Sequence, residues 1–132
     1  MSSLPDLWGR FERSVTRLQF GPEQRIEFYE TLALLLQNRV QLNEALRELY
    51  KVASDDGRKS NSALAVVCQE CMAGMAAGLP LSVALTDWVT DMEASLIAAG
   101  EASGTLQHVF ANIVRLIQVK KQMQGEALRA VL

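Results

Sequence analysis

Apolar residues recur at every third or fourth position along most of this 132-residue chain, which is the spacing of one face of an α-helix. The clearest example is the stripe formed by Leu64, Val67, Cys68, Cys71 and Met75. The sequence lacks the alternating β-branched runs and the paired turn residues that indicate a sheet. The pattern therefore predicts an all-α protein.

Glycine, proline and polar clusters divide this pattern into six core helices behind a short amphipathic one. The N-terminal helix is predicted over residues 6–18, and Gly21 and Pro22 separate it from the rest. Core helices are predicted over residues 23–38, 42–53, from a cap at Ser60 or Asn61 up to Gly78, 81–85, 91–99, and for about 20 residues after Thr105. We expect a compact six-helix bundle of antiparallel helical hairpins in residues 21–132, preceded by an amphipathic arm in residues 1–20.

Two corners that contain glycine separate the later helices. In the first, Gly78 is expected to end a helix, and Pro80 prevents its continuation. In the second, Gly100 and Gly104 bracket a polar break at which the chain can take positive φ and restart in a new direction. We predict a tight reversal between two helices at each corner.

Charge is distributed unevenly, although the net charge at pH 7 is only −2. No Lys or Arg occurs between Lys59 and Arg115, and the carboxylates of that interval include Asp87, Asp91 and Glu93. The middle of the chain is therefore purely acidic. Nucleic acid is disfavoured as a partner, because phosphate contacts need clustered Lys and Arg.

The N-terminal helix carries a candidate surface. Its apolar side chains share one face and its arginines the other, and the apolar set is Leu7, Trp8, Phe11, Val15 and Leu18. In one interpretation this stripe packs onto the bundle of its own chain. In the other it docks on a partner helix or on a membrane surface.

Neither a signal peptide nor a membrane span is recognised in the sequence. Charged residues interrupt the first 18 positions, where a signal peptide needs a continuous apolar region. The longest uncharged run, residues 71–86, is interrupted by glycine and proline and is shorter than the roughly 20 apolar residues of a span. We expect the chain as given to be soluble and cytoplasmic, with reduced cysteines.

Catalytic, cofactor-binding and metal-binding motifs are not recognised either, so we predict that the protein is not an enzyme. Cys68 and Cys71 form a C-x-x-C on an apolar stripe, and we expect two buried thiols there. A zinc or redox site is the alternative, but a closed zinc site needs four ligands. The one histidine, His108, has no recognisable nucleophile with an orienting acid, and we expect it on the surface or in helix packing.

Glu101 lies in the second corner, at a predicted helix boundary. Its carboxylate can accept backbone N–H groups of the following turn, which is the structural interpretation. Alternatively, it faces a basic residue of a partner or a divalent cation. The sequence does not distinguish these roles.

Three strings of residues resemble one known family in order and spacing. They are 28–38 followed by 42–46, then 78–85, then 96–106 with the string G-E-x-S-G-x-L. Together they resemble the F domain of the inner-membrane platform protein of type IV pilus and type II secretion systems, over about residues 22–132. The residues that carry the motif are Gly78, Pro80, Leu81, Ala84, Leu85, Gly100, Glu101, Ser103, Gly104 and Leu106. One departure is the turn between the first two core helices, residues 38–41, where the family usually has glycine.

The resemblance implies a cytoplasmic six-helix bundle that continues into a transmembrane helix. It further implies that the domain couples an assembly ATPase to pilin or pseudopilin subunits at the bacterial inner membrane, as a homo-oligomer and without a cofactor. On this basis we predict that Asp87, Asp91 and Glu93 belong to a surface that binds basic residues of the ATPase or of a neighbouring assembly protein. The basic residues Arg115, Lys120, Lys121 and Arg129 fit a segment next to the membrane on its cytoplasmic side. We therefore expect the excised N-terminal domain of a multi-pass membrane protein. The alternative is a stand-alone helical interaction module.

Overall fold

Seven helices make up the secondary structure of residues 4–131, which are the residues that the computed structural model describes. They are α1 (Leu4–Gln19), α2 (Pro22–Gln37), α3 (Leu42–Ala53), α4 (Ala63–Ala76), α5 (Leu81–Ala84), α6 (Asp91–Ser103) and α7 (Leu106–Val131). No strand occurs within this part of the chain. The all-α prediction is confirmed, and α2 to α7 are the six predicted core helices.

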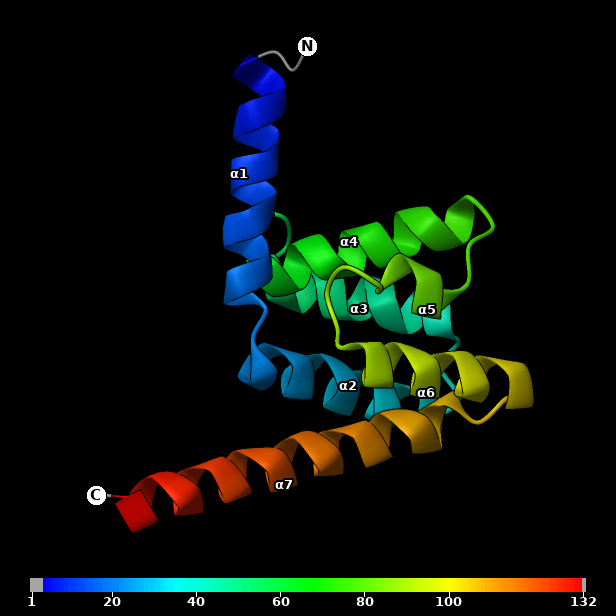
Figure 1. Ribbon diagram of the computed structural model, residues 1–132. Coiled ribbons are helices and arrows are strands. Elements are labelled where there is room, and N and C mark those ends of the chain that lie inside the picture. The colour runs from blue at the N-terminus through cyan, green and yellow to red at the C-terminus, as the bar shows by residue number, and fades with distance from the viewer. Residues whose placement is uncertain (1–3, 132) are drawn as a thin grey trace.

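The bundle is built from neighbouring helices that reverse direction at each corner (Figure 1). α2 packs along α7, α3 packs against α4, and α6 packs against both α5 and α7. Aromatic rings fill the centre: the rings of Tyr29 and Phe110 are stacked with centroids 5.6 Å apart, and Phe20 meets Phe28 edge to face. Through these contacts Phe20, which directly follows α1, packs with α2, and α2 packs with α7. All the core helices contribute to this single core.

The corner after α4 has the predicted geometry. α4 ends at Ala76, and Gly78 takes a left-handed conformation with φ of 89° just beyond the helix cap. Pro80 then stands at the N-cap of the short helix α5. Leu81 and Leu85 are fully buried, so this corner is held by the core as well as by its backbone.

The corner after α6 lies later in the chain than we predicted. α6 continues through Gly100 to Ser103, and only Gly104 takes positive φ, at 71°. Gly100 is instead a buried residue inside the helix, where an added Cβ would lie 2.7 Å from Cγ2 of Val109. The prediction that both glycines bracket the break was therefore wrong for Gly100, whose missing side chain lets α6 approach α7.

The turn between α2 and α3 contains a residue in the left-handed conformation that is not glycine. Arg39 has φ of 66° between α2 and α3. This conformation is unfavourable for residues with a Cβ and readily accessible to glycine. Arg39 therefore forms a reversal that glycine would adopt at lower cost.

α1 projects from the bundle rather than packing along it (Figure 1). None of the residues Leu4–Gln19 is buried, whereas the next residue, Phe20, lies in the core. The arm meets the bundle mainly at α4. Its apolar stripe is left exposed by the described part of the chain, least so at Val15, which is 37 % exposed.

Candidate interaction surfaces

The two glycine-containing corners are joined by Glu101. Its carboxylate accepts hydrogen bonds from the backbone N–H of Leu81, with Oε2 2.8 Å away, and of Ser82, with Oε1 2.9 Å away. These are N–H groups of the first turn of α5, which have no partner within that helix. Glu101 therefore caps a helix, but it caps α5, 20 residues earlier in the chain, rather than the turn that follows it.

The other motif residues serve the same framework. Ser103 donates to the carbonyl of Ala99 at 2.9 Å, and its Oγ lies 2.7 Å from Oγ1 of Thr105, which closes the second corner. The motif residue Ala84 on α5 packs closely against α4, because an added Cβ on Gly74 of α4 would lie 3.0 Å from Cβ of Ala84. The sequence motif therefore specifies how α4, α5, α6 and α7 approach each other.

Glu93 does not belong to an exposed acidic surface, and our prediction for this residue was wrong. Its side chain is buried, with 2 % of the residue exposed. Its carboxylate accepts hydrogen bonds from Nε of Arg25 at 3.1 Å, from the hydroxyl of Tyr29 at 2.6 Å and from Oγ1 of Thr90 at 3.0 Å. The physical reason is that a carboxylate surrounded by donors can be buried, and the helix pattern alone does not show those donors.

This buried cluster ties α6 to α2. Burial, followed by the nearby charge of Glu93, raises the pKa of Tyr29 well above its ordinary value, so the phenol keeps its proton for the hydrogen bond. Thr90 also caps α6 by accepting from the backbone N–H of Glu93 at 3.1 Å. Arg25 lies on α2, and its side chain is largely buried. The cluster fixes the start of α6 in place.

Asp87 and Asp91, in contrast, are exposed at the junction between α5 and α6. Asp91 begins α6, where a negative charge is favourable next to the helix N-terminus. Asp87 contributes to a contact with the arm, because its Oδ2 lies 3.0 Å from Nη2 of Arg13. Asp91 is thus the residue of the predicted acidic set that is both exposed and outside the arm contact.

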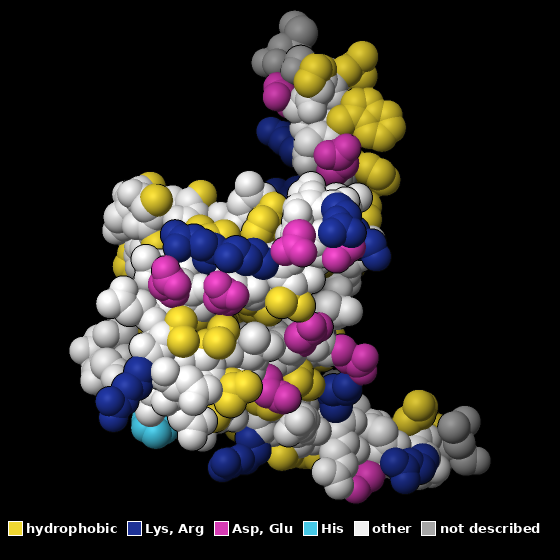
Figure 2. Space-filling view, turned by 180° about the vertical axis from the view of Figure 1, so that it is seen from behind, with side chains coloured by type: hydrophobic (Ala, Val, Ile, Leu, Met, Phe, Trp, Pro, Cys, Tyr) yellow, Lys and Arg dark blue, Asp and Glu magenta, His cyan; other side chains and the backbone are white. Residues whose placement is uncertain are grey.

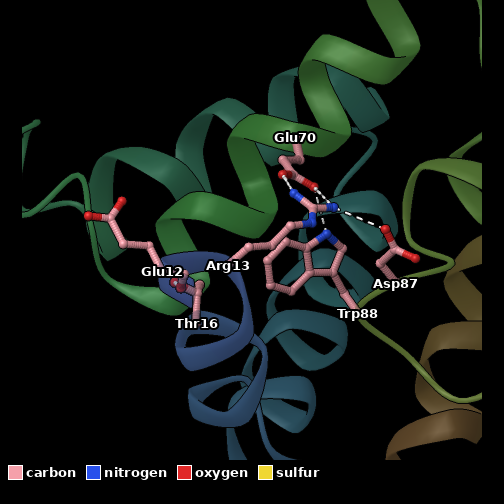
Figure 3. A network of polar contacts seen from close by, with 6 residues as sticks. All are labelled: Glu12, Arg13, Thr16, Glu70, Asp87 and Trp88. Atoms are coloured by element: carbon pink, nitrogen blue, oxygen red, sulfur yellow. Dashed lines mark hydrogen bonds and ion pairs between the residues drawn. The ribbon is translucent and has the colours of Figure 1, made fainter. Parts of the chain in front are cut away.

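Arg13 holds the arm to the bundle through several contacts at once (Figure 3). Its guanidinium forms a bidentate ion pair with Glu70 on α4 and also binds Asp87. It lies over the ring of Trp88, 5.0 Å from the centroid, and the Trp88 indole N–H donates to Glu70 at 2.7 Å. The hydrogen bond to Glu70 is the main cause of a raised pKa for Arg13. We call this set of four residues the arm clasp.

The arm clasp could not be found from the sequence. Arg13 and Glu70 are 57 positions apart, and no short spacing connects them. The one available signal was the presence of arginines opposite an apolar stripe, which indicates a polar face but no partner. Sequence analysis also missed Arg25 and Thr90 for the same reason.

The apolar stripe of the arm is exposed along its length. Leu18 is 85 % exposed and Trp8 is 63 % exposed, and Leu7, Phe11 and Val15 are exposed as well. Trp8 and Phe11 touch each other edge to face, with centroids 6.0 Å apart. The stripe also continues to Leu4, so six large apolar side chains share this face.

Cys68 and Cys71 are free, fully buried thiols in the core, as predicted. Burial raises the pKa of Cys68 to about 12 and holds the pKa of Cys71 well above its ordinary value, so both are protonated near neutral pH. Within residues 4–131, no three His, Cys, Asp or Glu side chains come together in a geometry that could hold a metal. His108 is exposed near the start of α7.

A comparison with protein-family models finds a match over most of the chain. The model described as type II secretion system (T2SS), protein F matches residues 28–132, which include α3 to α7 and most of α2. No curated protein matches the chain. Among the helices of residues 4–131, none has the length and apolar character needed to cross a membrane.

Proposed function

The chain belongs to the type II secretion system protein F family, a family of inner-membrane platform proteins, and we propose that residues 21–132 are its non-catalytic cytoplasmic coupling domain. In this role the domain transmits movement from an assembly ATPase to the pilin or pseudopilin subunits that are assembled at the inner membrane. Its partners are the ATPase, those subunits, other inner-membrane assembly proteins and further copies of itself. The match over residues 28–132 is the observation that carries this proposal.

Two features of the fold support a mechanical role. The two corners are tied by Glu101, and α6 lies close against α7 at Gly100, so a force applied at α5 or α6 reaches α7 through direct contacts. The Glu93 cluster adds a second connection, from α6 to α2. A helix assembly without such links would deform before it transmitted a displacement.

The exposed carboxylate of Asp91 supports a docking site for basic residues of the ATPase. It stands at the end of α6 that follows the α5 corner, in the interval without Lys or Arg. An unopposed negative charge of this kind favours association with a positive surface and increases the rate of encounter. Contact at this site would act directly on α6.

The test is a charge reversal in the full-length protein in its own cells. Asp91→Lys is expected to reduce pilus assembly or secretion strongly while the protein remains folded and present in normal amounts. Glu30→Lys is the matched control, because Glu30 is an exposed carboxylate on α2, outside the Lys- and Arg-free interval. Normal assembly with Asp91→Lys would contradict the proposed docking site.

A further inference from the structure

The arm helix α1 exposes an apolar face of unusual size for a small domain. Six large side chains form it, at positions 4, 7, 8, 11, 15 and 18. Contiguous apolar patches of this kind usually mark an interaction site for a protein or a membrane. The described bundle leaves this face exposed.

The arm clasp determines where this face points. Successive residues of an α-helix are about 100° apart, so Arg13 lies almost directly opposite the middle of the stripe. Because Arg13 is bound to Glu70, Asp87 and Trp88, the stripe is turned away from the bundle. Thr16, on the same side as Arg13, is correspondingly less exposed than its neighbours.

Cationic side chains accompany the stripe. Arg10 and Arg17 are exposed on the polar side of α1, next to the edge of the apolar stripe. Figure 2 shows the apolar side chains of the projecting arm on the same side of the molecule as the projecting end of α7. That end of α7 also carries exposed cations, Lys120 and Arg129, and exposed apolar residues such as Met123 and Leu128.

We propose that α1 lies flat on the surface of a bilayer that contains anionic lipids. The apolar stripe enters the boundary between headgroups and acyl chains, and Arg10 and Arg17 remain at the level of the lipid phosphates. A 16-residue helix is about 24 Å long, enough to lie in this boundary but not to span a bilayer. A lipid surface covers a long convex stripe without a complementary groove, and the adjacent arginines match its negative charge.

This proposal rests on membership of a family of inner-membrane proteins and not on the coupling to an ATPase. It assigns a membrane contact to the arm itself, separate from any transmembrane segment. The arm clasp then has a defined consequence, because it holds the bundle at a fixed orientation relative to the lipid surface. Both contacts of α1 are needed for that orientation.

Flotation with lipid vesicles tests the proposal on the purified 132-residue chain. Vesicles of phosphatidylethanolamine with phosphatidylglycerol are expected to bind the chain, and vesicles of phosphatidylcholine alone are expected to bind it much more weakly. Trp8 is exposed and Trp88 is 5 % exposed, so a blue shift of tryptophan emission on binding will come from Trp8. Brominated lipids should quench the same emission.

Two pairs of variants separate the apolar and the charged contributions. Trp8→Ser with Phe11→Ser is expected to lower the partition coefficient by about ten-fold for each ring removed. Leu34→Ser with Val52→Ser is the matched control, because both residues are exposed apolar positions on the bundle, and this pair should bind as the parent does. Arg10→Gln with Arg17→Gln should lower binding to anionic vesicles by about five-fold for each charge.

Several results would overturn the proposal. One is equal flotation with the two vesicle types, and another is flotation that persists after Trp8→Ser with Phe11→Ser. A third is a dimer in sedimentation that this pair dissociates, in a chain that does not bind vesicles, which would assign the stripe to a second copy. None of these measurements involves the ATPase, so the failure of this proposal and the failure of the coupling function are separable.

Discussion

Removing the carboxylate of Glu101 is expected to uncouple the two glycine-containing corners of the bundle. In Glu101→Ala, the backbone N–H groups of Leu81 and Ser82 lose their acceptor. Leu81 is fully buried and Ser82 nearly so, which leaves little room for water at the first turn of α5. The N-cap residue of α5 is Pro80, which makes no side-chain cap hydrogen bond of its own.

The expected cost follows from these two bonds. A hydrogen bond to a charged group contributes about 1.5–3 kcal/mol, and loss of a helix cap costs about 0.5–2 kcal/mol. Because Glu101 is itself partly exposed, we take the lower part of these ranges and expect a loss of about 2–3 kcal/mol. This corresponds to a fall in Tm of roughly 7–10 °C for a domain of this size. Glu101→Gln keeps one acceptor oxygen and should lose about half as much.

Urea unfolding followed by circular dichroism measures this loss, with Glu30→Ala as a control for an exposed carboxylate on a helix. Glu30→Ala should change the unfolding free energy by less than about 0.5 kcal/mol. Hydrogen exchange adds a local readout, because the amides of Leu81 and Ser82 should lose protection in Glu101→Ala before the rest of the core does. If Glu101→Ala unfolds within about 0.5 kcal/mol of the parent, the capping role is refuted.

Three further predictions concern other parts of the molecule. Arg39→Gly is expected to raise the unfolding free energy by up to about 1 kcal/mol, because glycine adopts the left-handed conformation of this corner at lower cost; a loss of stability on urea unfolding would contradict it. Arg13→Ala should release the arm, which would appear as faster trypsin cleavage within α1 and as altered Trp88 emission. The free energy of unfolding should fall by less than about 1 kcal/mol, because the ion pair with Glu70 is partly exposed. Burial raises the pKa of Cys68 to about 12, so the contribution of this thiol to the unfolding free energy should be constant below about pH 9 and fall as the pH rises toward 12. Cys68→Ala should therefore make the urea midpoint less sensitive to pH across that range, and an unchanged slope would contradict the assignment.

The helices could be predicted from the sequence because the apolar period of the core is local. The stripe from Leu64 to Met75 and the glycine at position 78 specify α4 and its end without reference to other helices. The same local reasoning placed the second corner too early, because Gly100 and Gly104 look alike in sequence. Only the distance to Val109 on the next helix distinguishes a packing glycine from a turn glycine.

The polar contacts could not be predicted because their partners are far apart in the chain. Glu101 reads as a local cap, yet it binds a turn 20 residues earlier. Glu93 resembles Asp87 and Asp91 in sequence, but the donors Arg25 and Tyr29 make its burial possible. The sequence therefore shows that the interval is acidic, but it does not show which of its carboxylates are exposed.

The most direct test of the coupling function is the affinity of this purified chain for the assembly ATPase of its own secretion or pilus system. We predict saturable binding that weakens as the salt concentration rises, and that Asp91→Lys lowers the affinity at least about ten-fold while Glu30→Lys leaves it unchanged. Isothermal titration calorimetry measures the three dissociation constants under one set of conditions. No binding by the parent chain, or equal affinity for the parent and Asp91→Lys, would contradict the account.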